Sequence, residues 1–519
     1  MSSIFKSLQQ KDQKNKKNAK KPKPDKRLGE RLDRELPYVI TLITIMAASG
    51  ITPFGSFSKL ARYRLLPYIM REARNIIGQV HILGEDPLTA MEKRANVSAS
   101  RQYRDLLMGY VSTVRNGGDI ASFLQSKMKS IFEYEVAVAR QSVAKIGGLV
   151  DAYMIMQVIG LSLYVVLVAM SSTSSGGGAA LPVSLPSSPV FSYFIVFVML
   201  PGISFAILYV MDKVVFTTLV GAKELLTKGI YFSLAAIVAF VALTATGVLQ
   251  KAIDPAYALP IFLIAASAWP AYKAMKMEKN MKGMEADLPS YLRDVAESRK
   301  AGLSPEKCIV YASQRMRDSV FQSVVKSFAN QLEWGVPLRK IYENLASSVK
   351  SFSALIHFRI LIEAIESGGG YTTSLEILAQ SSESSYNIDK EKTSMLKPYF
   401  FIAFMVTALT SITTLMVAQT FNEISGSVLA LGATPATPAV EPQNSGELSS
   451  TQMLAIGIAA QSWMSGFLMG KISSGSFATG FKYAVMLLLI SLLATVVTQE
   501  FNLSPSAFLS PPQTSQTGQ

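Results

Sequence analysis

Two glycine-rich stretches have the residue types and spacing of an anion-binding loop. The first, from Arg115 to Gln125, reads RNGGDIASFLQ, and the second, from Glu366 to Gln380, reads ESGGGYTTSLEILAQ. In both, glycines precede an apolar pattern that is typical of a helix. Free N–H groups and the dipole at a helix N-terminus favour negative charge, so each stretch could cradle a phosphate. Each could equally be a structural turn that occurs twice.

The residue types argue against a phosphate. A Walker A loop needs G-x-x-x-x-G-K-[ST], with a lysine that reaches the phosphates, and neither stretch contains that lysine. The first stretch places Asp119 where the phosphate would lie, and neither stretch follows a predicted strand. We therefore interpret both as turns between helices, with N-capping side chains after the glycines. The residues concerned are Gly117, Gly118 and Asp119 in the first turn, and Gly369, Gly370, Thr372 and Thr373 in the second.

Other catalytic patterns are missing from the sequence. There is no H-E-x-x-H or G-x-S-x-G motif, and the only histidines, His81 and His357, are too isolated for a zinc shell or a Ser/His/Asp set. The single cysteine, Cys308, excludes a disulfide framework. Glu363 and Glu366 have helical i, i+3 spacing, which we interpret as a solvated helix face rather than a general acid and base. We therefore expect no enzyme activity, no metal and no cofactor.

The composition predicts a membrane protein. Of 519 residues, 49% are hydrophobic and only 17% are charged, and the mean hydropathy is positive. A spanning helix needs roughly 20 mostly apolar residues. The sequence contains about seven such stretches, near residues 152–171, 190–211, 229–249, 255–273, 398–420, 452–470 and 482–498. The fold class that we predict is an all-α polytopic membrane protein.

The distribution of lysine and arginine predicts the orientation, because positively charged loops stay on the cytoplasmic side. With a cytoplasmic N-terminus, the external segments carry only one basic residue, Lys251. We therefore predict a multi-pass protein of the cell membrane with its N-terminus in the cytoplasm and its C-terminus outside. Away from their ends, the apolar stretches contain no Asp, Glu, Lys or Arg, and Gln157 and Gln461 are the amides farthest from the ends. This composition disfavours a transporter, which needs polar groups in its membrane core.

Two long hydrophilic regions, residues 1–151 and 274–397, repeat each other. ELPYVITLITIMAASGITP, from Glu35 to Pro53, aligns with DLPSYLRDVAESRKAGLSP, from Asp287 to Pro305, 252 residues further on. An internal repeat means that one structural unit is used twice, and we predict two cytoplasmic bundles of about five or six short helices. The landmarks of the repeat are Pro37, Gly50, Pro53, Gly84, Gly117 and Gly118 in the first copy, and Pro289, Gly302, Pro305, Gly335, Gly369 and Gly370 in the second.

Each landmark has a local physical reason. The Leu-Pro pairs at Pro37 and Pro289 are predicted to open a helix, since proline at the first helical position lacks only a donor that would stay unpaired. Glycine takes the left-handed conformation after a helix C-terminus, so Gly50 and Gly302 are predicted to close that helix. The Thr-Pro or Ser-Pro pair that follows then starts the next helix.

These observations divide the chain into six parts. They are a basic disordered arm (1–34), a first helical module (35–148), transmembrane helices 1–4 (149–273), a second helical module (274–397), transmembrane helices 5–7 (398–498) and an external disordered tail (499–519). The basic arm is predicted to be a disordered tail. The alternative is that it docks on an acidic partner or on anionic lipids. Nucleic acid is disfavoured because no aromatic residues alternate with its lysines. The tail holds a glycosylation sequon at Asn502.

The ordered duplication, with membrane helices after each module, resembles the type II secretion F-domain family. These are the inner-membrane platform proteins of type IV pilus-like machines. The seven-helix arrangement and the late segment MSGFLMGKISSGSFATGFKYAVMLLLIS are most similar to the archaeal branch, which includes the archaellum platform protein. The resemblance covers nearly the whole chain beyond the basic arm.

The resemblance implies a role without catalysis. Such platforms bind a cytoplasmic hexameric secretion ATPase and convert its movements into extraction of pilin-like subunits from the membrane. The expected partners are therefore the ATPase, the subunits and membrane lipids, and no nucleic acid. We also expect a homodimer, since the G-x-x-x-G motif from Gly466 to Gly470 permits close helix contact or dimerisation. An archaellum, an adhesive pilus and a DNA-transfer pilus all fit these residues, and a multi-spanning transporter or channel is the alternative function.

Overall fold

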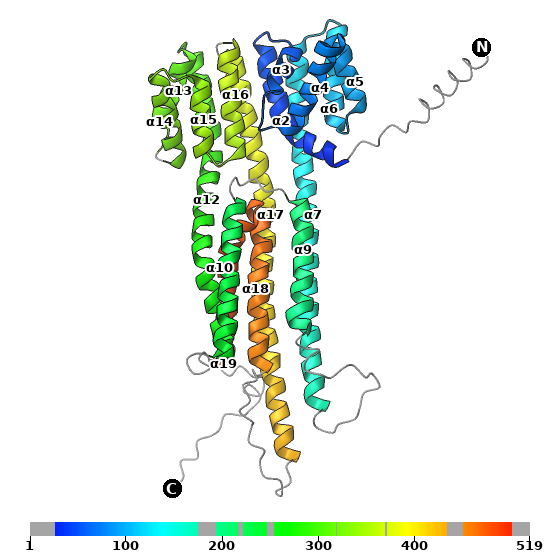
Figure 1. The fold of residues 1–519 in the computed structure, drawn as a ribbon, viewed down its shortest axis with the longest axis vertical. Helices are drawn as coiled ribbons and strands as arrows, with labels where there is room; N and C mark the ends of the chain where they lie inside the picture. The colour runs from blue at the N-terminus through cyan, green and yellow to red at the C-terminus, as the bar shows by residue number, and fades with distance from the viewer. Residues whose placement is uncertain are drawn as a thin grey trace, which may run out of the picture. The chain divides into compact units, whose positions relative to one another are not determined.

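The computed structural model describes residues 26–174, 194–215, 222–246, 254–317, 319–368, 371–432 and 450–500. Within these ranges the chain forms sixteen α-helices, one short π-helix, one short 3-10 helix and no strand (Figure 1). The prediction of an all-α protein is confirmed. Outside the described residues lie the start of the basic arm, Gly369 and Gly370, most of the external segments, and Asn502.

The chain folds as two compact units. The described residues of the first unit lie within 26–137, 285–349 and 353–387. Those of the second unit lie within 138–284, 350–352 and 388–500. Three long helices contribute residues to both units, namely α7 (Ile120–Ser174), α12 (Pro255–Lys300) and α17 (Thr372–Gly432). The first unit thus combines the two regions that repeat each other in sequence.

Two modules with the same order of helices build the first unit. The first module consists of α2 (Lys26–Ala48), α3 (Pro53–Leu60), α4 (Pro67–Leu83), α5 (Pro87–Val97), α6 (Arg101–Arg115) and the start of α7. The second module consists of the end of α12, α13 (Pro305–Arg315), α14 (Val320–Glu333), α15 (Leu338–Ser348), α16 (Phe352–Gly368) and the start of α17. The repeat in sequence is therefore a repeat in structure.

Helical spacing of apolar residues explains why these segments pack as bundles. In both modules the third helix buries residues spaced by about one turn. These are Ile69, Ala73 and Ile76 in α4, and Phe321, Val325 and Phe328 in α14. In the second module, the Phe358 ring of α16 packs against the rings of Phe321, Phe328 and Tyr291 at centroid distances of 5.9 to 6.1 Å. Burying each such side chain stabilises the fold by about 1.5–3 kcal/mol.

The connections between helices meet a backbone requirement at corresponding places. Gly50 and Gly302, which follow α2 and α12, have φ angles of +79° and +89°. Side chains other than hydrogen are strained in this left-handed region, so glycine is favoured there. The hydroxyl of the next Thr or Ser then accepts a backbone N–H at the start of the following helix. These bonds run from Gly55 to Thr52 at 3.3 Å and from Lys307 to Ser304 at 3.4 Å.

The Leu-Pro pairs do not open helices. Pro37 lies in the middle of α2, and Pro289 lies inside α12, so the predicted helix starts at these prolines are wrong. A proline inside a helix costs about 3 kcal/mol, but apolar periodicity continues before each proline. Leu32 and Met284 are buried one turn earlier and hold the preceding turns in the bundle. Residues 26–34, which the composition assigns to the basic arm, are accordingly the first turns of α2.

The second unit is built from helices that can span a membrane. Among the described residues, seven helices are long and apolar enough, as predicted, and the chain is a membrane protein. They lie in α7, α9 (Leu200–Val214), α10 (Ala222–Ala245), α12, α17, α18 (Ser450–Ser474) and α19 (Gly480–Glu500). The number of spanning helices predicted from the sequence is confirmed.

The Gly466–Gly470 motif packs against a helix of the same chain. A Cβ atom added to Gly470 would lie 2.1 Å from the backbone nitrogen of Gly480, and one added to Gly466 would lie 2.3 Å from the Cα atom of Ala484. Glycine is therefore needed for α18 and α19 to approach this closely. Of the two roles that the motif permits, close contact and dimerisation, the structure uses the first within the chain.

Candidate docking and coupling site

The first glycine-rich stretch is a turn whose helix N-terminus is already capped. After α6, the backbone reverses at Gly117, whose φ is +67°, and the Gly118 N–H donates to the Thr113 carbonyl at 2.9 Å. Asp119 then accepts the backbone N–H of Ala121 at 3.0 Å. Its carboxylate occupies the place that a phosphate would need, as the N-cap interpretation predicts. In the second stretch, α17 begins at Thr372.

The glycine turns of both modules lie at one end of the first unit. Consecutive helices joined by such short connections run antiparallel, so every second connection returns to the same end. The turns that share this end contain Gly50, Gly84 and Gly117 in the first module, and Gly302 and Gly335 in the second. We call this the turn end. The opposite end is the one where α7, α12 and α17 pass from the first unit into the second.

Large apolar side chains are exposed at the turn end. Ile82 and Leu83, the last residues of α4, are 83% and 66% exposed, and Trp334, which follows α14, is 82% exposed. Tyr371, directly before α17, is also exposed. Exposed aromatic and aliphatic side chains that gather on one surface mark interaction sites more often than scattered ones do. The turn end is therefore the candidate docking surface of this unit.

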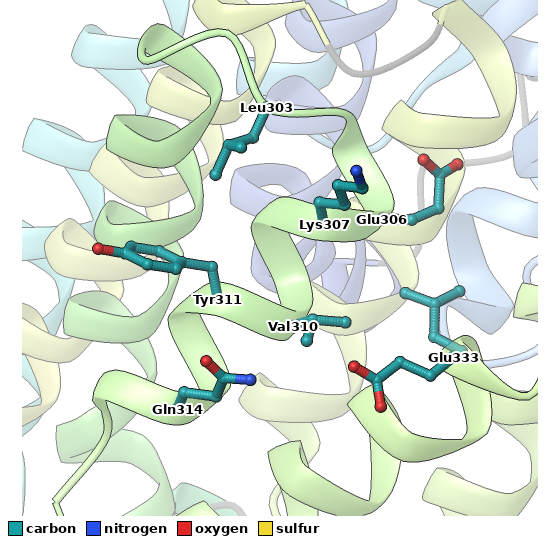
Figure 2. A pocket seen from close by; sticks show the side chains of 8 residues that line it. Leu303, Glu306, Lys307, Val310, Tyr311, Gln314 and Glu333 are labelled. Carbon is teal, nitrogen blue, oxygen red and sulfur yellow. The ribbon is translucent and has the colours of Figure 1, made fainter.

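A pocket opens beside Trp334 in the second module. Its volume is about 410 Å³, and Leu303, Val310, Tyr311 and Leu332 provide an apolar lining. Figure 2 shows Glu306, Lys307, Val310 and Gln314 along α13, with Glu333 of α14 on the other side. The pocket thus has an apolar floor and a charged rim, which is an arrangement suited to one large side chain of a partner.

A row of hydroxyl groups joins the two modules. Thr41 of α2 and Ser381 of α17 share a hydrogen bond of 2.7 Å, and Ser49 and Ser374 share one of 3.1 Å. Ser374 also donates to the Ile45 carbonyl at 3.3 Å. As the residue numbers rise along α2 they fall along α17, so these helices are antiparallel. Small hydroxyl side chains bring the two backbones close, and their mutual hydrogen bonds satisfy groups that are buried there.

A partly buried ion pair lies in the same joint, with the Glu363 side chain 4% and the Lys59 side chain 33% exposed. The Lys59 Nζ atom of α3 lies 2.8 Å from Glu363 Oε1 of α16, and the Arg359 Nη2 atom lies 3.5 Å from Glu363 Oε2. The Tyr63 hydroxyl donates to the same carboxylate at 3.5 Å. The Arg359 guanidinium also lies over the Tyr63 ring, 5.1 Å from its centroid. We call Lys59, Tyr63, Arg359 and Glu363 the joint cluster, and it fixes the register between the modules.

Within the first module, Glu35 caps a helix other than its own. Its carboxylate accepts the backbone N–H of Tyr68 at 3.2 Å and of Ile69 at 2.7 Å, at the start of α4. No side chain of the α4 N-terminus itself forms this cap. Burial raises the pKa of Glu35 to about 7, against the two hydrogen bonds that lower it. In the second module, α14 is capped instead by its own Ser319, which accepts the Gln322 N–H at 3.2 Å.

The two histidines and the cysteine are far from forming a reactive site. His357 is fully buried, and burial lowers its pKa to about 4, so the ring is neutral at physiological pH. Its Nδ1 atom lies 2.8 Å from the Ser353 carbonyl. Cys308 is buried, whereas His81 is exposed. Within the described part of the chain, no group of three His, Cys, Asp or Glu side chains could hold a metal ion.

In the second unit, polar groups join helices to one another. The Gln461 amide of α18 donates to Ser204 of α9 at 2.7 Å and to Tyr153 of α7 at 3.1 Å. Tyr153 also shares a hydrogen bond of 2.9 Å with Ser465. Gln461 thus forms hydrogen bonds between helices. These bonds hold three membrane helices together, which is how polar side chains act within many membrane bundles.

The joint cluster and Trp334 were not found by inspecting sequence patterns. Glu363 was predicted to lie on a solvated face, but it is only 3% exposed, so that prediction is wrong. Local spacing cannot reveal a partner such as Lys59, which is about 300 residues away in the chain. Glu366, one turn further on, is exposed as predicted, and its carboxylate lies 3.2 Å from the Arg339 Nε atom. For Trp334, the signal available was its place directly before a repeat glycine.

Comparisons with known proteins show a likeness to one family over part of the chain. The family model described as type II secretion system (T2SS), protein F, matches residues 291–418. A protein of Methanocaldococcus jannaschii, described as uncharacterized, is 21% identical over 397 residues, which cover 70% of this chain. The chain spans about 64% of the length of that relative. No solved structure matches the chain.

The matched range has a clear place in the structure. It begins within α12, includes α13 to α16, and ends within the membrane-spanning part of α17. It therefore contains most of the second module and the membrane helix that follows it. The first module lies outside the range but repeats the same helices and turns. This part of the chain, residues 291–418, is similar to the type II secretion system protein F family.

Proposed function

We propose that this protein is the membrane platform of a type IV pilus-like assembly machine, either an archaeal pilus or an archaellum. It couples a cytoplasmic secretion ATPase to the insertion of pilin-like subunits into the filament. The single observation that carries the proposal is the family match over residues 291–418. The role is one of transmission, and the protein itself is not an enzyme.

The first unit supports this role because its two modules are connected as one compact body. The hydroxyl row and the joint cluster contain hydrogen bonds and ion pairs that cross from one module to the other. A partly buried ion pair resists separation, because breaking it leaves an uncompensated charge. A displacement applied to one module is therefore passed to the other. The continuous helices α7, α12 and α17 lead from this unit into the membrane-spanning segments.

The distribution of basic residues supports a cytoplasmic position for the first unit. The external segments of the proposed topology carry one basic residue, Lys251, whereas the chain has 50 in total. Positive charge is retained on the cytoplasmic side. The ATPase partner is therefore proposed to meet the first unit, and the subunits are proposed to meet the membrane helices.

Co-purification with the cognate ATPase tests the proposal. The full chain, extracted in mild detergent from cells that make filaments, is expected to retain the ATPase. Cells that lack the chain are expected to make no filaments while still making ATPase and subunits. Deletion of residues 6–27 tests how far the basic arm contributes to binding. Filaments that assemble without the chain would refute the platform role, and solute flux in proteoliposomes would favour a transporter instead.

A further inference from the structure

The two modules present an apolar side chain at the same position of the repeat. Leu83 precedes Gly84, and Trp334 precedes Gly335, and each of these glycines ends the third helix of its module in the left-handed conformation. Both side chains are mostly exposed, at the turn end of the unit. The two turns correspond in the repeat but differ in their caps, because Gly84 is itself the C-cap of α4 whereas Trp334 is the C-cap of α14. The unit therefore offers twice an exposed apolar side chain that precedes a left-handed glycine.

Unpaired carboxylates surround these apolar side chains. Asp86, Asp119, Glu306 and Glu333 are exposed at the turn end, and no ion pair holds any of them within the described residues. Most basic side chains nearby are neutralised by other acids. These pairs are Lys93–Glu85, Arg115–Glu92, Lys300–Glu376 and Arg339–Glu366. Lys307 and Lys340 are exposed there without an ion pair among the described residues, so the four unpaired carboxylates outnumber the unpaired lysines. The turn end is therefore weakly acidic although the chain as a whole carries a formal net charge of +14.

This charge determines which occupant fits. A second copy of the chain would bring an equally acidic turn end, and like charges brought together across an interface are costly. Anionic lipid headgroups would be repelled for the same reason. A complementary surface has apolar pockets with lysine or arginine at their rims. The repeated apolar side chain further requires that the partner presents such a pocket more than once.

We infer that the turn end docks a partner built from identical subunits, and that Leu83 and Trp334 enter the same pocket on two of those subunits. The inference rests on the proposed function, which identifies the partner as the secretion ATPase. A partner with a single pocket could accept only one of the two side chains. A homo-oligomer repeats its surface, so a duplicated binding feature can engage two neighbouring subunits together.

The two contacts are unequal in size. In the second module, the pocket of about 410 Å³ beside Trp334 can receive a side chain from the partner. In the first module, Phe54 and His81, whose ring centroids lie 6.2 Å apart, take the repeat positions of the pocket residues Glu306 and Leu332. The second module therefore contributes both a side chain and a pocket, whereas the first contributes only side chains. Trp334 is the larger anchor, since tryptophan is enriched among residues that dominate binding.

Binding of the purified ATPase to the full chain in detergent tests the inference. Trp334→Asn is expected to weaken binding about tenfold, and Leu83→Asn somewhat less. The double variant is expected to lose more affinity than either single variant, because both side chains act on one oligomer. Val97→Asn is the matched control, since Val97 is equally exposed but ends α5 at the opposite end of the unit. Wild-type affinity in both single variants would overturn the inference.

Cross-linking tests whether Leu83 and Trp334 contact the same pocket of the partner subunits. The only cysteine, Cys308, is buried, so Leu83→Cys and Trp334→Cys each create a single accessible thiol. After attachment of a photoreactive maleimide, both variants are expected to cross-link to the same peptide of the ATPase. Val97→Cys is expected to give no such product. Cross-links to different peptides, or to a second copy of this chain, would overturn the inference.

A charge variant separates this site from the positive surface elsewhere on the first module. Arg62 and Arg64 are exposed in the connection between α3 and α4, at the opposite end from the glycine turns. Neutralising both, as Arg62→Gln and Arg64→Gln, is expected to leave ATPase binding unchanged, whereas Glu306→Lys with Glu333→Lys weakens it. If the arginine variant loses binding and the glutamate variant does not, the turn end is the wrong surface but the platform role stands. If the wild-type chain does not bind the ATPase, both proposals fail.

Discussion

The first module has an aromatic pair where the second module has a pocket. The Phe54 and His81 rings lie 6.2 Å apart in the first module, while Glu306 and Leu332 line the pocket at the corresponding positions of the second. The neighbouring turns are nevertheless similar in both modules, with left-handed glycines and hydroxyl N-caps. Features that the backbone requires have been kept in both copies. Features that only face solvent or a partner have diverged.

The modules also differ in what they contribute to their joint. The repeat position of Glu363 is Val111 in the first module, and that of Lys59 is Tyr311 in the second. Val111 is buried in its own module, and Tyr311 lines the pocket. The opposite charges therefore belong to the joint and not to the repeat itself. This asymmetry means that the two modules cannot exchange places.

The largest effect is expected from removing Glu363, the carboxylate of the joint cluster. Glu363→Leu leaves Lys59 and Arg359 without their acid, and we expect it to destabilise the contact between modules by about 3 kcal/mol. Hydrogen exchange of amides in α16 and the start of α17, in the full chain, measures this. Glu366→Leu is the control, because the exposed pair with Arg339 contributes only about 0.5 kcal/mol. Equal loss of protection in both variants would mean that the joint cluster has no special role.

Replacing the turn glycines tests the equivalence of the modules. Gly50→Ala and Gly302→Ala each force an alanine into the left-handed region, where we expect a cost of about 1–2 kcal/mol. Thermal unfolding of the full chain in detergent checks whether the two costs agree. Gly78→Ala, inside α4 with its nearest neighbouring atom 4.0 Å from the new Cβ, is expected to stabilise instead. Clearly unequal costs at Gly50 and Gly302 would argue that the turns differ in their surroundings.

Removing the aromatic pair of the first module has a smaller expected effect. Phe54→Ala removes a half-buried ring from the first module, and we expect a loss of about 1 kcal/mol in unfolding free energy. Tyr311→Ala, on the rim of the pocket that is already open, is expected to cost less. The same thermal measurement compares them. If Tyr311→Ala is the more damaging change, the pocket beside it is a packed part of the core.

The pH dependence of Glu35 gives the smallest effect, about 1 kcal/mol or less, because water reaches part of the site. Its pKa of about 7 in the folded protein exceeds the usual value of 4.5, so the fold binds the proton more tightly than the unfolded chain does. The stability it contributes is present below pH 4.5 and is lost as the pH rises through 7. Unfolding temperatures at pH 5 and pH 8 should show this loss.

Glu35→Gln should flatten that profile, because a glutamine oxygen can accept the same backbone N–H groups without titrating. The second module provides the control. Its α14 is capped by its own Ser319, so Asp287→Asn at the corresponding repeat position should leave the profile unchanged. A profile that persists in Glu35→Gln would assign the pH dependence to another group.

The sequence predicted those features that depend on local chemistry. Left-handed glycines, hydroxyl caps and long apolar stretches are each set by a few neighbouring residues, and all of these appear in the structure. Pro37 and Pro289 were misread because a helix can continue through a proline when the turns on both sides are buried. In that case tertiary packing outweighs the local preference of proline for a helix start.

Features of the candidate site depend on contacts between distant segments, which local patterns do not contain. Carboxylates of the turn end stay unpaired because Arg115 and Arg339 pair with acids on other helices, Glu92 and Glu366. The joint of the two modules likewise needs Thr41 to meet Ser381, 340 residues away in sequence. The duplication itself was visible in the sequence, but the packing of its copies into one unit was not.

The close contact between α18 and α19 has a consequence for biogenesis. These helices come last among those described, yet α18 is the most enclosed of the membrane spans, with 78% of its apolar window buried against 22–44% for the others. Because chains are synthesised from the N-terminus, the earlier helices are inserted before α18, the helix that they enclose, is present. Insertion of the final hairpin then completes the bundle. A premature stop before Gly466 should therefore leave all preceding helices without their common neighbour, exposed to quality-control proteases.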